Sequence, residues 1–217
     1  MDILYQDNRI AVCLKPPGVL STDEPGGMPS LLRAALGTDC VRTVHRLDAA
    51  VGGVMVFARS RMAASILSEQ IREHRFQKEY LAVVHGMLPA EGRMQDFLLR
   101  DRRDGMTRVA EAGTPGAKEA RLSYRVLARI DDKTLVRVAL ETGRTHQIRV
   151  HMAAIGHPII GDPVYGLKKD RFSNIGGQCL HAAKLTLTHP RTGERMTFSA
   201  PLPEYFTEIL GKLERMQ

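Results

Sequence analysis

The sequence predicts an α+β fold built on a mostly antiparallel sheet. Three pairs of strand-like segments are each joined by a polar turn, which is the pattern of a β-hairpin. A few segments with helical periodicity lie between them. Hairpins combined with isolated helices are typical of an α+β fold. A chain of 217 residues can bury a real core, either as one elongated domain or as two closely joined halves.

The N-terminal third alternates strands and helices. Residues 3–4 and 10–14 are apolar segments on either side of a polar turn, which predicts two short strands. Ser30 is a candidate N-cap for a short helix that runs to Leu36 and ends at Gly37.

A buried strand and a second helix follow. Residues 54–58 form a continuous apolar run, which predicts the strand. Ser60 is the expected N-cap of a helix that runs to about Arg72. The apolar face of this helix is expected to consist of Met62, Ile66 and Ile71.

From Gln77 onward the pattern is mainly that of strands, beginning with residues 80–84. The predicted hairpins pair residues 97–100 with 107–110, 121–130 with 134–141, and 180–188 with 196–199. A helix is expected over residues 145–156, and a terminal helix is expected to begin at Pro203.

Composition narrows the class of protein. The net charge is +7 and the isoelectric point is about 9.6, which favours an anionic polymer as partner. Aromatic residues make up only 5% and Trp is absent, which argues against a surface that stacks many bases. No apolar run approaches the length of a membrane helix, and the N-terminus lacks the pattern of a signal peptide. We therefore expect a cytoplasmic protein. The three cysteines are far apart, which favours neither a disulfide framework nor a zinc site.

The most informative segment is His45-Arg46-Leu47-Asp48, which leads through Gly52 and Gly53 into the apolar run. A carboxylate at the entry to a buried strand is costly unless it is paired. Paired glycines allow another backbone or a ligand to come close. This combination suggests a working carboxylate, although an aspartate that pairs with Arg46 or caps a turn is the structural alternative.

A second segment, Thr142-Gly143-Arg144-Thr145-His146-Gln147-Ile148-Arg149-Val150-His151, strengthens the functional interpretation. Together the two segments resemble the signatures of the RluA-type pseudouridine synthases, which isomerise uridine to pseudouridine in RNA. Further similar segments are residues 78–86, residues 156–166 and Leu180-His181-Ala182. The resemblance runs in order from about residue 3 to about residue 203. One departure is Val51-Gly52-Gly53, where the family usually has Thr-Ser-Gly.

The resemblance implies the pseudouridine synthase fold, a long, mostly antiparallel mixed sheet with flanking helices and a central cleft. The family often carries an extra N-terminal RNA-binding domain. This chain is expected to begin directly at the catalytic domain, so we expect a single catalytic domain over residues 1–217 without that module.

The resemblance also implies roles for three side chains. Asp48 is expected to be the catalytic nucleophile, since a carboxylate beside the sugar can attack it or accept a proton. Arg144 is expected to be a buried partner that pairs with Asp48 and keeps it ionised. Tyr80 is expected to pack against the target base and to accept a proton. The structural alternatives are a phosphate-facing surface arginine and a half-buried strand tyrosine.

The expected RNA contacts are Arg46, Lys78, Gln147 and Arg149. The spacing of the histidines predicts no metal site, and we expect no cofactor. We expect a monomer that acts on ribosomal or transfer RNA without an obligatory protein partner and without a membrane. Two rival hypotheses stay open, a catalytically idle RNA-binding module of the same fold and a metal-dependent nuclease or hydrolase built on the histidines.

Overall fold

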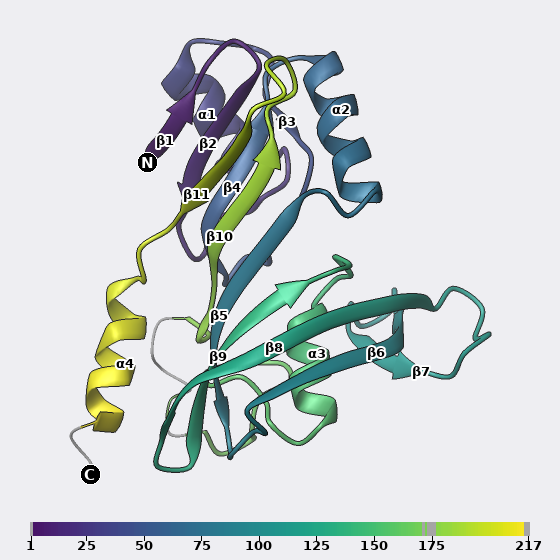
Figure 1. Cartoon of the computed structure of the whole chain (residues 1–217), viewed down its shortest axis with the longest axis vertical. Helices are drawn as coiled ribbons and strands as arrows, with labels where there is room; N and C mark the ends of the chain where they lie inside the picture. Colours follow the sequence, from purple (N-terminus) through teal and green to yellow (C-terminus); the bar gives the residue numbers. More distant parts are fainter. Residues whose placement is uncertain (1, 171, 173–176, 215–217) are drawn as a thin grey trace. The chain divides into compact units, whose positions relative to one another are not determined.

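The computed structural model describes residues 2–170, 172 and 177–214, and the chain divides into two compact units (Figure 1). The first unit consists of Met1–Lys78 and His181–Leu202, and the second of Glu79–Leu180 and Pro203–Gln217. Each unit has its own strands and helices, so each is described separately. No helix among the described residues is long and apolar enough to cross a membrane.

The strands of the first unit are hydrogen-bonded in the order β1-β2-β4-β10, with β3 beside β4 and β11 beside β10. Their bounds are Ile3–Gln6 for β1, Ile10–Lys15 for β2, Arg42–Thr43 for β3, Gly52–Ala58 for β4, Leu180–Thr188 for β10 and Arg195–Ser199 for β11. Strand β4 runs antiparallel to β2 and parallel to β10. This order places the start of β4, which follows Asp48, between two other strands.

Two helices belong to the first unit, α1 (Met28–Leu36) and α2 (Arg61–Arg72). Helix α1 begins two residues before the predicted cap Ser30, with Gly27 as its N-cap, because Pro29 in the first turn is already preorganised for a helix. Gly37 ends the helix in the left-handed conformation, as predicted.

Helix α2 packs on the sheet of the first unit. The Ser60 hydroxyl caps it by accepting a hydrogen bond from the Ala63 backbone nitrogen at 3.1 Å, as predicted. The residues that α2 buries are Ala63, Leu67 and Gln70. The predicted apolar face was wrong at Met62, which is 66% exposed, whereas Ile71 is partly buried against the core of this unit.

The second unit contains most of the antiparallel hairpins. Its strands follow the order β5-β9-β8-β6-β7, and β5 begins in the first unit with Gln77 and Lys78. Their bounds are Gln77–His85 for β5, Glu91–Arg100 for β6, Thr107–Ala110 for β7, Lys118–Ile130 for β8 and Lys133–Leu140 for β9. The pairs β6–β7, β6–β8 and β8–β9 are antiparallel, and the first and last of them confirm two predicted hairpins. The third predicted hairpin is the antiparallel pair β10–β11 of the first unit.

Helix α3 (Gln147–Ala154) covers one face of this sheet, where Val150 packs against Leu98 of β6 and Ala120 of β8. Helix α4 (Glu204–Glu214) buries Phe206 and Ile209. Because α3 lies on β6 and β8, the turn that precedes it, with Gly143 and Arg144, is held close to β8. The α+β fold with a mixed, mostly antiparallel sheet is thus confirmed, while the central cleft and the single catalytic domain stay predictions.

Candidate active site

Asp48 lies in the loop that leads into β4, and the backbone of this loop is held from both sides. The Ser21 hydroxyl donates to the Leu47 carbonyl at 2.8 Å and accepts from the Leu47 backbone nitrogen at 3.1 Å. On the other side, the Val51 backbone nitrogen donates to the Asp48 carbonyl at 3.0 Å. Asp48 itself is half-buried, so its loop is fixed while the side chain keeps access to solvent.

Lys15 supplies a buried cation to this loop. Its side chain is only 1% exposed, and its Nζ donates to the carbonyls of Pro16 and Ala49, each at 2.9 Å. Burial lowers the pKa of Lys15 to about 8, and the charge of Asp48 opposes this shift. Lys15 therefore fixes the residue that follows Asp48 and places a positive charge near the carboxylate.

The two glycines that begin β4 allow neighbouring segments to lie close to its backbone. Gly53 has φ +131° and lies opposite Ala182 of β10, whose carbonyl oxygen would clash with any Cβ at position 53. At Gly52 a Cβ would lie 3.1 Å from the Pro17 ring. Pro17 therefore limits the space for the serine side chain of the usual Thr-Ser-Gly segment, and Val51, which replaces the threonine, is buried.

His45 is a structural residue of this loop. Its Nε2 accepts a hydrogen bond from the Val56 backbone nitrogen at 3.1 Å, and its ring packs edge-on against Phe76. Burial, with a smaller effect from Lys78, lowers the pKa of His45 to about 3. The imidazole is thus neutral at physiological pH and anchors the His-Arg-Leu-Asp segment to β4.

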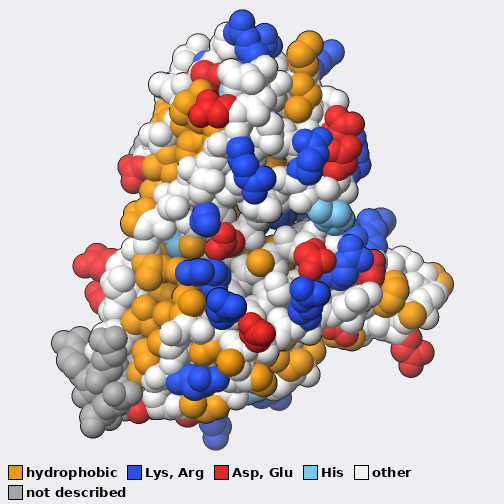
Figure 2. All heavy atoms as spheres, in the orientation of Figure 1, with side chains coloured by type: hydrophobic (Ala, Val, Ile, Leu, Met, Phe, Trp, Pro, Cys, Tyr) orange, Lys and Arg blue, Asp and Glu red, His pale blue; other side chains and the backbone are white. Residues whose placement is uncertain are grey.

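Two of the four expected RNA contacts lie in the first unit. Arg46 is exposed, as an RNA contact must be. Lys78 is half-buried, and burial lowers its pKa to about 8. It therefore loses its proton at a lower pH than an exposed lysine does. Figure 2 shows Lys and Arg side chains distributed over both units on the visible face, with acidic side chains among them.

Arg144 lies in the second unit, in the turn before α3. The expectation that Arg144 is buried was wrong, because its side chain is exposed, and its Nε donates to the Glu119 carbonyl of β8 at 2.7 Å. Its backbone nitrogen donates to Gln147 Oε1 at 2.9 Å. Tyr80 is buried in β5 of the same unit. The ion pair between Asp48 and Arg144, which belong to different units, stays a prediction.

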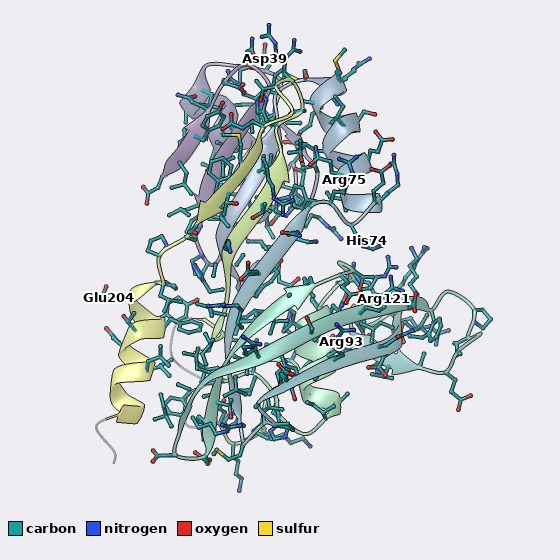
Figure 3. All side chains as sticks on the ribbon, viewed as in Figure 1. Asp39, His74, Arg75, Arg93, Arg121 and Glu204 are labelled. Carbon is teal, nitrogen blue, oxygen red and sulfur yellow. The ribbon has the colours of Figure 1, made fainter. Side chains whose placement is uncertain are left out.

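The prediction of an RNA contact at Gln147 was wrong. The side chain is 2% exposed, and its amide is hydrogen-bonded to Thr142, Arg144 and Arg121. Arg121, labelled in Figure 3, provides through its backbone carbonyl the acceptor for Gln147 Nε2 at 3.0 Å. Gln147 is therefore an internal brace of the turn that carries Arg144.

The prediction for Arg149 was also wrong. Arg149 is 5% exposed and forms a bidentate pair with Asp162, at 2.7 Å through Nε and 2.8 Å through Nη2. Its guanidinium lies 5.0 Å from the centre of the Tyr165 ring. Burial acts to raise the pKa of Asp162, but Arg149 and two backbone N–H groups hold it below its ordinary value. A guanidinium so engaged cannot reach an RNA phosphate.

The histidines in and around α3 each contact a different partner. His146 has a left-handed backbone (φ 56°), and its Nδ1 lies 2.9 Å from the Tyr165 hydroxyl. His151 is buried with its Nε2 3.6 Å from Asp96, and His157 Nδ1 bonds the His85 carbonyl at 2.8 Å. Within the described part of the chain, no group of three or more His, Cys, Asp and Glu residues is arranged to hold a metal ion.

The sequence interpretation missed Lys15, Ser21 and Thr142. Lys15 carried a weak signal, since a lysine that ends an apolar strand before Pro16 and Pro17 is unusual. Ser21 and Thr142 carried none, because their partners Leu47 and Arg121 lie more than 20 residues away in the sequence.

Comparison with known proteins gives a consistent result. The family model described as RNA pseudouridylate synthase matches residues 9–154, which include both catalytic motifs. An uncharacterised RNA pseudouridine synthase of Bacillus subtilis, YlyB, is 38% identical over 99% of this chain and 73% of its own length. The dual-specificity RNA pseudouridine synthase RluA of Haemophilus influenzae is 38% identical over 92% of each chain.

Other curated relatives are longer, and the chain spans 53% of one and 61% of another. Among solved structures, human RNA pseudouridylate synthase domain containing 4 superposes with a TM-score of 0.80 and 25% identity, covering 98% of this chain and 92% of the human chain. Sequence motifs, fold and relatives therefore agree that the chain belongs to the RNA pseudouridylate synthase family, whose members convert uridine in RNA to pseudouridine.

Proposed function

We propose that this chain isomerises specific uridines in structured RNA, with Asp48 as the catalytic nucleophile. The observation that supports this role is the construction of the loop around Asp48. The backbone on both sides of the carboxylate is tied down by Ser21 and Lys15, and the buried ammonium of Lys15 lies near it. A fixed, partly desolvated carboxylate beside a cation is suited to attack on a sugar carbon.

The reaction rearranges bonds within one nucleotide. The glycosidic carbon–nitrogen bond breaks with Asp48 as nucleophile or proton acceptor, the freed uracil turns, and the sugar rejoins it through a ring carbon. That carbon then loses its proton, and the ring nitrogen that was released from the sugar gains one. Atoms and electrons balance within the substrate, so the chemistry requires neither an oxidant nor a metal, and we propose a cofactor-free enzyme.

Arg144 and Tyr80 complete the proposed site from the second unit. Among the described residues, only Nε of the Arg144 guanidinium is hydrogen-bonded, to Glu119, which leaves its terminal nitrogens for the carboxylate of Asp48. Tyr80 is proposed to pack against the target base and to accept a proton during the rearrangement. In this proposal the two units act together as one catalytic domain over residues 1–217.

The target uridine has to leave its stack to reach Asp48, at a cost of a few kcal/mol. Basic side chains offset this cost through phosphate contacts, and we propose Arg46 and Lys78 for this role. A relative from Neisseria meningitidis is named a ribosomal large subunit pseudouridine synthase, which supports ribosomal RNA as a substrate class. Transfer RNA is the second substrate class that we propose. We further propose that the chain acts as a cytoplasmic monomer.

The experiment compares total RNA from cells with and without the gene by mapping pseudouridine. Purified protein treated with chelator is then incubated with transcripts that contain each site lost in the deletion strain. Formation of pseudouridine at those sites by the metal-free protein supports the proposal. Activity that disappears with chelator and returns with zinc or magnesium, while the RNA fold is unchanged, contradicts the cofactor-free mechanism.

A further inference from the structure

Gln147 is the centre of a closed hydrogen-bond network in the second unit. Its Oε1 accepts from the Thr142 hydroxyl at 2.8 Å and from the Arg144 backbone nitrogen at 2.9 Å. Its Nε2 donates to the Arg121 carbonyl at 3.0 Å. The Thr142 hydroxyl in turn accepts from the Arg121 backbone nitrogen at 2.8 Å. One buried amide thus ties the turn that carries Arg144 to the N-terminal part of β8.

The orientation of this amide is determined by its partners. A backbone N–H can only donate, so the atom that faces Arg144 must be the oxygen. The carbonyl of Arg121 can only accept, so the atom that faces it must be the nitrogen. Because Gln147 is 2% exposed, water cannot replace a lost partner easily. The network therefore has one arrangement, and Thr142 and Gln147 both contribute to it.

Strand β8 holds the Arg144 side chain as well as its backbone. The Glu119 carbonyl accepts from Arg144 Nε at 2.7 Å, and Glu119 lies two residues before Arg121 on the same strand. The backbone carbonyls of residues two apart on a strand point toward the same edge of that strand, so one strand anchors both the backbone and the guanidinium of Arg144. An exposed arginine normally samples many rotamers, and this arrangement removes much of that freedom.

We propose that Gln147, together with Thr142, is a positioning residue for Arg144 in uridine isomerisation. The inference rests on the proposed role of Arg144 in the active site. Gln147 does not touch the substrate in this account. It fixes the backbone from which Arg144 extends, so that the guanidinium meets the carboxylate without a reorganisation cost during the reaction.

The test uses isosteric variants and the shortest transcript in which the wild-type protein forms pseudouridine. Gln147→Met removes all three side-chain hydrogen bonds at nearly constant volume. Thr142→Val removes the hydroxyl, and Thr142→Ser restores it. Gln70→Met is the matched control, because Gln70 is equally buried and braces Thr188 in the first unit through two hydrogen bonds.

Single-turnover rates at saturating RNA and dissociation constants are measured for each variant, with urea unfolding as the stability reference. Misplacement of an active-site group costs up to about 100-fold, so we expect Gln147→Met to lower the saturated rate at least about tenfold. Thr142→Val should also be slow and Thr142→Ser near normal. RNA affinity should change little in all of them. Gln70→Met should lose stability while keeping the wild-type rate.

A double-variant cycle distinguishes positioning from a general structural role. If Gln147 acts through Arg144, combining Gln147→Met with Arg144→Lys should give a rate close to that of Arg144→Lys alone. Losses that multiply overturn the proposal. So does a normal saturated rate in Gln147→Met, or a loss of affinity alone, which would make Gln147 an RNA contact. If Gln147→Met does not fold, equal rates for Thr142→Val and Thr142→Ser overturn it.

A wild-type protein that forms no pseudouridine in any transcript contradicts the proposed function instead. That outcome is visible before any variant is compared, so the two failures are distinguishable.

Discussion

Removing the guanidinium of Arg149 should destabilise the second unit and leave the salt dependence of RNA binding unchanged. In Arg149→Met, the Asp162 carboxylate keeps the backbone donors of Val164 and Tyr165 on Oδ1 but loses the two bonds from Arg149. Its side chain is fully buried, and breaking a buried pair on one side costs about 3–5 kcal/mol. We expect a loss of that size in the free energy of unfolding.

The assay is urea unfolding followed by far-UV circular dichroism, since the chain contains no Trp. Arg125→Met is the matched control, because Arg125 and its partner Glu91 are mostly exposed and lie 3.5 Å apart. This control should change stability far less. Adding Asp162→Asn to Arg149→Met removes the unpaired charge and should recover part of the loss.

The pH dependence gives a second readout of the same pair. The folded-state pKa of Asp162 is lowered, so its ion pair contributes stability above the unfolded pKa, and that stability is lost as pH falls through the folded pKa. Arg149→Met should therefore show a shallower loss of stability on acidification. Normal stability combined with a salt slope reduced by about one contact would refute this reasoning and restore Arg149 as an RNA contact.

Three further predictions concern Lys15, the two glycines of β4 and Arg144. Lys15→Met should lower the saturated rate with little change in RNA affinity. Because the Lys15 ammonium loses its proton as pH rises through about 8, the wild-type rate should fall over that range. This fall should be absent in Lys15→Met and present in Lys78→Met. Gly53→Ala should lower the free energy of unfolding by at least about 3 kcal/mol, measured with urea, because backbone strain and a clash with Ala182 combine. Gly52→Ser should lower it less, because the Pro17 ring can shift. Equal losses in the two variants would contradict this difference. Arg144→Lys keeps the charge but loses the planar fork, so single-turnover rates should fall more than affinity does; a normal rate would contradict its pairing with Asp48.

The sequence was sufficient to predict most strands and hairpins, because their turn residues are local signals. Asp104 and Gly105 mark the β6–β7 connection, and Ser60 caps α2. The buried face of α2 was not predicted. This face consists of residues 63, 67 and 70, and residue 70 is a polar glutamine. A buried glutamine needs hydrogen-bond partners, and its partner Thr188 lies 118 residues away in the sequence.

In the candidate site, too, local signals could be predicted and contacts between distant residues could not. Asp48 and Arg144 could be singled out by motif, since each motif is a short continuous segment. Whether the neighbouring Gln147 and Arg149 face RNA or the protein depends on Arg121 and Asp162, which contact them through the fold. A helical segment rich in polar residues is usually solvated, so a buried ion pair there was not expected from the sequence.

The most direct test of the central claim is the single-turnover rate of Asp48→Asn at saturating RNA. The substitution keeps the shape of the side chain and removes its negative charge. The account predicts that pseudouridine formation falls to background, while RNA affinity and the urea midpoint remain close to those of the wild type. Substantial pseudouridine formation by Asp48→Asn would contradict the role of Asp48 as nucleophile.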